Sequence, residues 1–198
     1  SVIIWLFILI LSMSLSLSWD VGKLDDVFNQ TILFQVRLPR LLEAMLTGAV
    51  LTLAGQVYQI VLNNPLADSF TLGLASGASL GSGIALFLGL SFLWFPIFSI
   101  IFSLITLLLV LSVSAMLAKG YPVQMLILTG LLLGALLNAL LYLLVLINPK
   151  KMNPIASYLF GGFASAEYQD VMIISLIASV AIIVLFLMQK GIKLLQVG

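Results

Sequence analysis

Apolar stretches of about 17 to 25 residues recur along this chain, and they limit its fold more than any other feature. A helix needs about 20 consecutive apolar residues to cross the hydrocarbon core of a bilayer. Hydrophobic residues make up 63% of the 198 residues and charged residues 8%, whereas soluble domains are about 45–50% apolar and about 25% charged. The sequence therefore predicts an all-α fold, a polytopic transmembrane helical bundle.

Six membrane spans and one half-length helix are predicted from these stretches. The spans cover about residues 2–18, 41–62, 70–92, 94–118, 123–147 and 170–188, and the half-length helix covers about 155–166. A cleaved signal peptide is the alternative for the first span, but the charged segment that opens such peptides is missing. Residues 19–36 hold three of the seven acidic residues, so we expect an extramembrane loop there, with a short amphipathic helix at the interface.

The chain contains no cysteine and no histidine. Disulfides, thiolate nucleophiles, zinc sites and histidine acid–base catalysis are therefore excluded, and we expect no resident cofactor and no metal site. A formal net charge of +1 gives no reason to expect nucleic acid as a partner. No G-x-x-x-x-G-K-[ST] loop occurs, so no ATP site and no enzyme activity are predicted for this chain.

Four motifs follow one another in a characteristic order. They are RLPR (residues 37–40), NPLAD (64–68), the Gly/Ser/Ala-rich stretch TLGLASGASLGSG (71–83) and YLFGGFASAEYQDV (158–171). In this order the chain resembles the FecCD family, the membrane permeases of ABC importers for iron-siderophores, haem and vitamin B12. Such permeases have about ten spans, so we expect this sequence to be the N-terminal part of one.

The resemblance implies a transport mechanism and a set of partners. A permease of this kind works by alternating access in the cell membrane of a bacterium, driven by a separate ATP-binding subunit. Its other partners are an extracytoplasmic substrate-binding protein, a second permease copy and the lipid bilayer. The alternative is an ion-coupled secondary transporter, in which Glu43 inside the second span would hold the coupling ion.

Two arginines precede the second span. Arg37 and Arg40 are typical of interfacial anchors, but the resemblance assigns Arg37 to docking of the substrate-binding protein, and Arg40 is expected to take part beside it. Pro39 is expected in the first turn of the helix, where its missing N–H has no cost. Glu43 lies three positions after Arg40, so the two are expected to form an ion pair on one helical face, with a role in the substrate path as the alternative.

The inner end of the pathway is predicted from two segments. The turn at Asn64 and Leu66 is either a plain helix connection or, by the resemblance, a cytoplasmic gate. The resemblance adds Val123 and Gln124, at the start of the fifth span, as a second inner constriction.

Small and polar residues mark the pathway itself and its outer end. Gly130, Gly134 and Asn138 share one helical face by their spacing of four, and this face points either at another helix or at a polar cavity. The resemblance favours the cavity, which would make these residues line the pathway. The pair Gly161 and Gly162 interrupts the half-length helix, where the family has an outer gate.

A second glycine stripe, at Gly73, Gly77 and Gly81, is predicted to pack closely against a neighbouring helix. Six spans would place both termini in the cytoplasm, as the resemblance implies. The cytoplasmic loops would then hold Lys119, Lys190 and Lys193, and the outer loops Lys23, Arg37, Arg40, Lys150 and Lys151. The positive-inside rule opposes this orientation, which we retain because Arg37 has its own explanation at the outer face.

Overall fold

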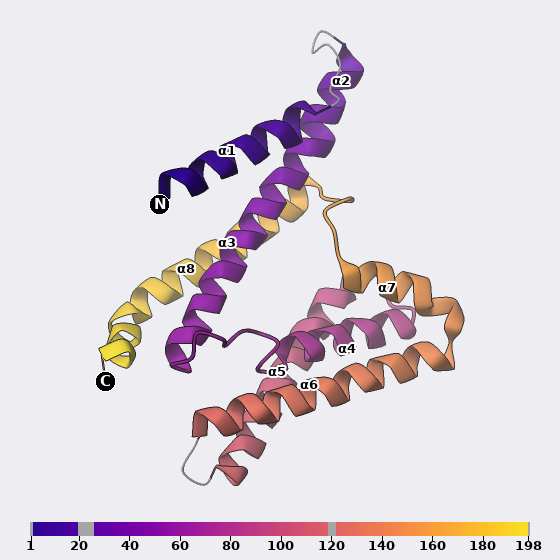
Figure 1. Ribbon diagram of the computed structural model, residues 1–198. Coiled ribbons are helices and arrows are strands. Elements are labelled where there is room, and N and C mark those ends of the chain that lie inside the picture. The colour runs from indigo at the N-terminus through magenta and orange to yellow at the C-terminus, as the bar shows by residue number, and fades with distance from the viewer. Residues whose placement is uncertain (1, 20–25, 119–121, 198) are drawn as a thin grey trace. The chain divides into compact units, whose positions relative to one another are not determined.

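The computed structural model describes residues 2–19, 26–118 and 122–197, and every regular element within these ranges is helical (Figure 1). The elements are α1 (Val2–Ser18), α2 (Val27–Thr31), the π-helix η1 (Ile32–Arg37), α3 (Leu38–Val61), α4 (Leu74–Phe87), α5 (Trp94–Leu117), α6 (Pro122–Ile147), the 3-10 helix η2 (Pro149–Lys151), α7 (Met152–Phe160) and α8 (Tyr168–Val197). The predicted all-α membrane fold is confirmed. Lys23 and Lys119 lie outside the described residues.

Four helices in the described part of the chain are long and apolar enough to cross a membrane. They are Val27–Val61, Trp94–Leu117, Val123–Ile147 and Tyr168–Gly191. Two further apolar helices, α1 and α4, have 17 and 14 residues. At 1.5 Å per residue α4 is about 21 Å long, which is less than the roughly 30 Å of a hydrocarbon core.

The expected loop over residues 19–36 is wrong for residues 27–36. There α2, η1 and α3 form one continuous helix that begins after Asp26, whose Oδ1 accepts a hydrogen bond from the Phe28 N–H. Pro39 consequently lies inside a helix and not in a first turn. The turn just before it is π-helical, and the Leu38 N–H donates to the Leu33 carbonyl. Such turns occur where the regular hydrogen bonds of an α-helix are interrupted.

Three other helices differ in length from their predicted bounds. The third span was predicted over residues 70–92, but α4 is shorter because glycines with positive φ stand at both ends, Gly73 at 70° and Gly89 at 72°. Positive φ is a conformation that glycine adopts at little cost, and it commonly ends a helix. Helix α7 ends at Phe160 because Gly161 follows it, whereas α8 begins at Tyr168 and continues well beyond residue 188.

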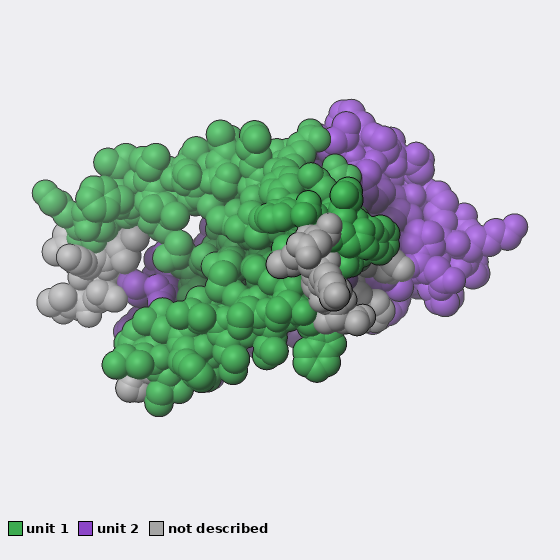
Figure 2. All heavy atoms as spheres, turned by 90° about the horizontal axis from the view of Figure 1, so that it is seen from above, with its two compact units in different colours: residues 1–53, 162–193 green, residues 54–161, 194–198 purple. Residues whose placement is uncertain are grey.

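The chain divides into two compact units, which are coloured separately in Figure 2. Unit 1 comprises residues 1–53 and 162–193, and unit 2 comprises residues 54–161 and 194–198. Within unit 2, α4 packs against both α5 and α6, and α5 packs against α6 (Figure 1). Eight of the fourteen residues of α4 are buried, so this short helix is the centre of unit 2.

Candidate functional site

Two glycines of α4 face α5 without any gap. A Cβ at Gly77 would collide with the Thr106 hydroxyl and lie 3.0 Å from the Phe102 carbonyl oxygen, and one at Gly81 would lie 2.8 Å from the Phe102 Cβ. The backbones of the two helices therefore approach as closely as glycine alone allows. In a bilayer such close packing is a main source of helix association.

The glycines of α6 face the beginning of α4. A Cβ at Gly130 would meet the Thr71 carbonyl and lie 2.9 Å from the Leu72 Cα, and one at Gly134 would lie 3.1 Å from the Ser76 Oγ. Gly73 belongs to the same contact, since a Cβ on it would lie 3.0 Å from the Gly130 carbonyl oxygen. Gly130 and Gly134 thus pack against α4 and the residues just before it. Asn138, the polar member of the predicted stripe, follows one turn later.

Asn138 lies between a helix contact and a cavity. Its Nδ2 donates a hydrogen bond to the Ser76 Oγ on α4 at 3.2 Å. Asn138 also lines a cavity of about 430 Å³, within the range of small-molecule pockets. The other lining residues come from α4, α6 and α7: Ser79, Leu141, Tyr142, Val145, Met152, Ile155, Ala156 and Leu159. Both interpretations of this face, a neighbouring helix and a cavity, thus describe part of its surroundings.

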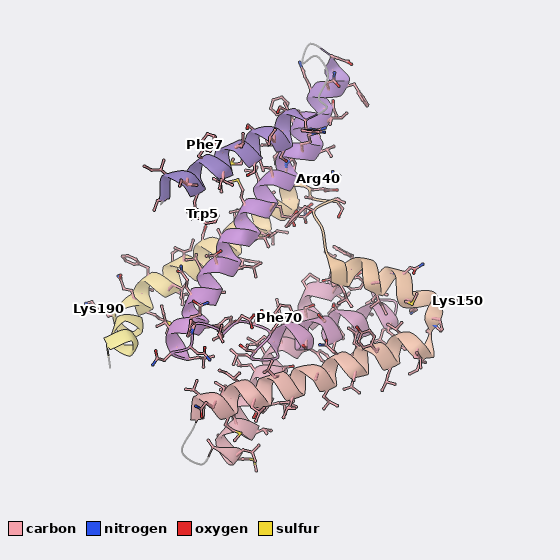
Figure 3. All side chains as sticks on the ribbon, in the orientation of Figure 1. Trp5, Phe7, Arg40, Phe70, Lys150 and Lys190 are labelled. Atoms are coloured by element: carbon pink, nitrogen blue, oxygen red, sulfur yellow. The ribbon has the colours of Figure 1, made fainter. Side chains whose placement is uncertain are left out.

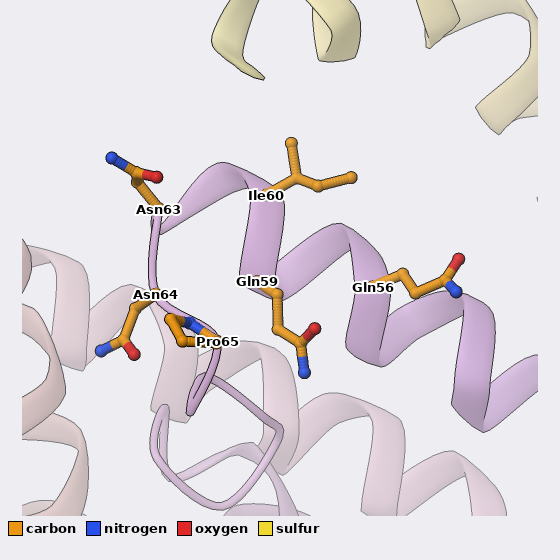
Figure 4. Close-up of a pocket in the computed structure, with 6 residues that line it drawn as sticks. All are labelled: Gln56, Gln59, Ile60, Asn63, Asn64 and Pro65. Atoms are coloured by element: carbon orange, nitrogen blue, oxygen red, sulfur yellow. The ribbon is translucent and has the colours of Figure 1, made fainter. Parts of the chain in front are cut away.

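A second, more polar pocket lies where α3 ends (Figure 4). It has a volume of about 540 Å³, and its lining residues are Gln56, Gln59, Ile60, Asn63, Asn64 and Pro65. Four of the six carry carboxamides and none carries a charge. The Asn64 Oδ1 accepts a hydrogen bond from the Leu66 N–H at 2.9 Å, while the Leu66 side chain is 80% exposed.

Sequence reasoning missed Gln56 and Gln59 in this pocket. Their spacing of three places both on one face of α3, and Asn63 follows in the turn after the helix, so this polar run could have been recognised from the sequence. Val123 and Gln124, at the start of α6, are exposed and do not line this pocket with Asn64. This pocket therefore does not bring the two predicted inner segments together.

Both arginines of the RLPR motif contact backbone carbonyls within unit 1. The Arg37 Nη1 donates to the Ser16 carbonyl at 3.3 Å and also to that of Trp19, at the end of α1. The Arg40 Nη2 donates to the Ala164 carbonyl in the segment before α8. The last carbonyls of a helix have no intrahelical partner, so Arg37 caps α1. The sequence carried no signal for these long-range bonds.

The expected ion pair between Arg40 and Glu43 is wrong, although both residues lie in the described part of the chain. The Glu43 Oε2 atom is buried and has no hydrogen-bond partner there. Arg40 instead bonds to the Ala164 carbonyl. The carboxylate that acts electrostatically on Glu43 is Asp170, at the start of α8 in the same unit. A spacing of three residues would have allowed Arg40 and Glu43 to pair, but the Arg40 guanidinium bonds to a backbone carbonyl instead.

The two glycines at 161 and 162 follow α7 directly. Their φ values are 67° and 145°, and Gly161 has ψ −173°, a combination that is essentially restricted to glycine. Both are exposed, and unit 2 gives way to unit 1 between them. Among the described residues, no group of three or more acidic side chains gathers to hold a metal ion.

Several apolar helices of spanning length, arranged as a helical bundle, define a multi-pass membrane protein. The chain belongs to the FecCD transport family, which matches it over residues 1–198, so the resemblance inferred from the four motifs is confirmed. Curated relatives that match the chain are named as permease proteins.

Three comparisons illustrate the relationship. The molybdate import system permease protein MolB of Haemophilus influenzae is 36% identical over 149 residues, which are 74% of this chain and 44% of that protein. An iron chelatin transport system permease protein of Helicobacter pylori is 35% identical over 168 residues, 84% of this chain and 50% of that protein. A solved inward-facing conformation of a metal-chelate type ABC transporter has a TM-score of 0.80 and 31% identity, covering 97% of this chain and 63% of that chain. The chain thus spans about half the length of the relatives it matches.

Proposed function

We propose that this chain is the membrane permease part of a binding-protein-dependent ABC importer in the cell membrane of a bacterium. The observation that carries the proposal is the match to the FecCD transport family over the whole chain, together with the TM-score of 0.80 to a metal-chelate type ABC transporter. A separate ATP-binding subunit supplies the energy, a second permease copy completes the path, and the cargo moves by alternating access.

The sites of the importer follow from where the structure places the predicted residues. We propose the turn at Asn64 and Leu66 as the inner gate, because it borders an uncharged polar pocket that a hydrophilic cargo would pass without being trapped by charge. Val123 and Gln124 form a second constriction. The cavity at Asn138 belongs to the pathway, and α7 with Gly161 is the outer gate.

The identity of the transported cargo provides a test of the proposed function. Relatives are named for molybdate and for an iron chelate, and we propose an iron-siderophore, haem or corrinoid for this chain because the carboxamide pocket offers neutral polar groups and no cation to hold a small oxyanion such as molybdate. The full complex in proteoliposomes, supplied with its binding protein and ATP, should take up a labelled iron chelate and leave molybdate outside. Uptake of molybdate alone would overturn the proposed cargo but not the importer.

An ion-coupled secondary transporter is the alternative, and the buried, unpartnered Oε2 of Glu43 favours it. The two functions separate in one experiment. Uptake that requires ATP and survives dissipation of the ion gradient supports the importer. Uptake that persists without ATP, collapses with the gradient and is abolished by Glu43→Gln would replace it.

Docking of the binding protein is proposed at Arg37 and Arg40. An Arg37→Glu variant of the complex should bind the binding protein more weakly. The substitution replaces a guanidinium that would pair with an acidic partner by a carboxylate that repels it. Arg37→Met is the matched variant, since it removes the α1 cap without adding the repulsion. Equal affinity of both variants and the original complex would contradict the docking role.

A further inference from the structure

Lys151 joins two elements that lie far apart in the sequence. From η2, immediately before α7, its Nζ donates to the Leu86 carbonyl at 3.4 Å and to the Phe87 carbonyl. The same atom lies 5.3 Å from the centre of the Phe87 ring, within the range of a cation–π interaction. One half-buried ammonium group therefore contacts the end of α4 in three ways.

The end of α4 is a place where a cation is needed. The last carbonyls of any helix lack partners within the helix and carry the negative end of the helix dipole. The N–H groups of Gly89 and Leu90 return to the carbonyls of Leu86 and Ala85, and Lys151 supplies the Phe87 carbonyl. An unpaired carbonyl is costly wherever water is scarce, so a donor at this end stabilises the helix.

Helix α7 is held to unit 2 along its length. Ile155 is 2% exposed and packs with Leu80 and Leu141. One turn further, the Tyr158 ring meets the ring of Phe95 edge-on at 5.2 Å. Lys151 fixes the beginning of the helix, and these apolar contacts hold its middle, before the chain leaves unit 2 at Gly161.

We propose that Lys151 is a positioning residue, whose bonds to the end of α4 hold α7 over the cavity beside Asn138. Met152, Ile155, Ala156 and Leu159 of α7 line that cavity, so release of Lys151 would open it on the α7 side. The role in transport rests on the proposed function of α7 as the outer gate. The polar bonds of Lys151 can break and re-form in each cycle, whereas the apolar contacts give α7 a default position.

The absence of native cysteine allows a direct test. In the complete transporter, a single cysteine at Ala156 reports access to the cavity through its rate of reaction with a water-soluble maleimide. Lys151→Met keeps the apolar stem but removes the charge and the donors, and it should raise this rate about tenfold, the effect of losing one charge-assisted hydrogen bond. Lys151→Arg should restore the original rate within about twofold.

Lys150 provides the matched control, because it is exposed in the same turn (Figure 3). Lys150→Met should leave labelling of the Ala156 cysteine unchanged. A second reporter cysteine at Ser114, which is 4% exposed on α5, should also keep its rate in Lys151→Met, since a general loosening of the fold would raise both. If Lys151→Met fails to assemble, Phe87→Leu removes only the ring and should raise the Ala156 rate by about threefold.

Labelling that does not change in Lys151→Met, or that rises equally in Lys150→Met, overturns the proposal. A measurement of ATP-driven uptake distinguishes the positioning role of Lys151 from the proposed role of α7 as the outer gate. If labelling rises while uptake keeps its rate, Lys151 positions α7 but α7 is not the gate. If both change and Lys151→Arg rescues both, the positioning role and the gate stand together.

Discussion

The two units hold their helices together by different means. In unit 2, α4 uses glycine to bring its backbone against the side chains and carbonyls of α5 and α6. In unit 1, long side chains reach across to backbone carbonyls, as Arg37 does to α1 and Tyr168 does to the Phe34 carbonyl. Burial follows the same division, because eight of the fourteen residues of α4 are buried but only Pro39 among residues 38–53, the part of α3 in unit 1.

The difference shows what each kind of contact requires. Close packing at glycine cannot accommodate added atoms, because the neighbouring atoms belong to the backbone or to the first atoms of a side chain and cannot move aside. A tether through a guanidinium is directional and flexible, so its loss frees one element but leaves the rest in place. The glycine contacts of α4 in unit 2 should therefore respond to added volume, and the arginine tethers of unit 1 to lost donors.

The largest expected effect is that of filling the α4–α5 contact. Gly81→Leu should lower the stability of the detergent-purified protein by about 3 kcal/mol, because the new Cβ would meet the Phe98 carbonyl and the Phe102 side chain. Thermal unfolding measures the loss. Gly48→Leu is the control, since nothing lies within 4 Å of a Cβ at that position in α3. Equal melting temperatures for the two variants would remove the contrast between the units.

Removal of the arginine tethers should come next. Arg37→Met should speed hydrogen exchange at the last turn of α1 about tenfold, because it loses the capping bonds to Ser16 and Trp19. Exchange in α4 should stay as it is. Faster exchange in both helices would mean that the units are not independently stabilised.

A smaller loss is expected at the turn that leads into α4. The Asp68 Oδ1 accepts hydrogen bonds from the N–H groups of Phe70 and Thr71, at 2.9 and 2.8 Å. Asp68→Ala should cost about 1 kcal/mol, the usual effect of removing such a cap. Denaturant titration in detergent measures it, with Asp68→Asn as the variant that keeps the acceptor and should lose less than half as much.

The smallest effect is expected at the bond between Asn138 and Ser76. A double-mutant cycle with Asn138→Leu and Ser76→Ala should give a coupling of about 0.6 kcal/mol, typical of hydrogen bonds between membrane helices. A coupling above about 2 kcal/mol would show that polar contacts contribute to unit 2 as strongly as its glycine packing does.

The fold class and the family could be predicted because both depend on features that are local in the sequence. Apolar length predicts spanning helices, and the motifs RLPR, NPLAD and YLFGGFASAEYQDV follow one another in the order that the family has. The continuous helix over Val27–Val61 was missed because acidic residues before it suggested a loop, while the helix begins only after Asp26. The short α4 was missed because its ends depend on backbone conformation at Gly73 and Gly89.

The candidate sites divide in the same way. The spacing of four that groups Gly130, Gly134 and Asn138 on one face is a property of any helix, so it could be read directly. The bonds of Arg40 to Ala164 and of Lys151 to Phe87 join residues that are 124 and 64 positions apart, and nothing in the local sequence selects those partners. For the same reason the pairing of Arg40 with Glu43 was a reasonable prediction and a wrong one.

Gly161 has a consequence for how substitutions at different glycines should be interpreted. A Cβ there would meet nothing within 4 Å, as at Gly48 and Gly55, yet its φ of 67° and ψ of −173° suit only a residue without a side chain. The mirror image of these angles is an ordinary extended conformation. A D-alanine introduced by chemical synthesis would therefore fit where L-alanine is strained. The requirement for glycine at this position comes from the backbone angles, whereas at Gly77 and Gly81 it comes from the lack of space for a Cβ.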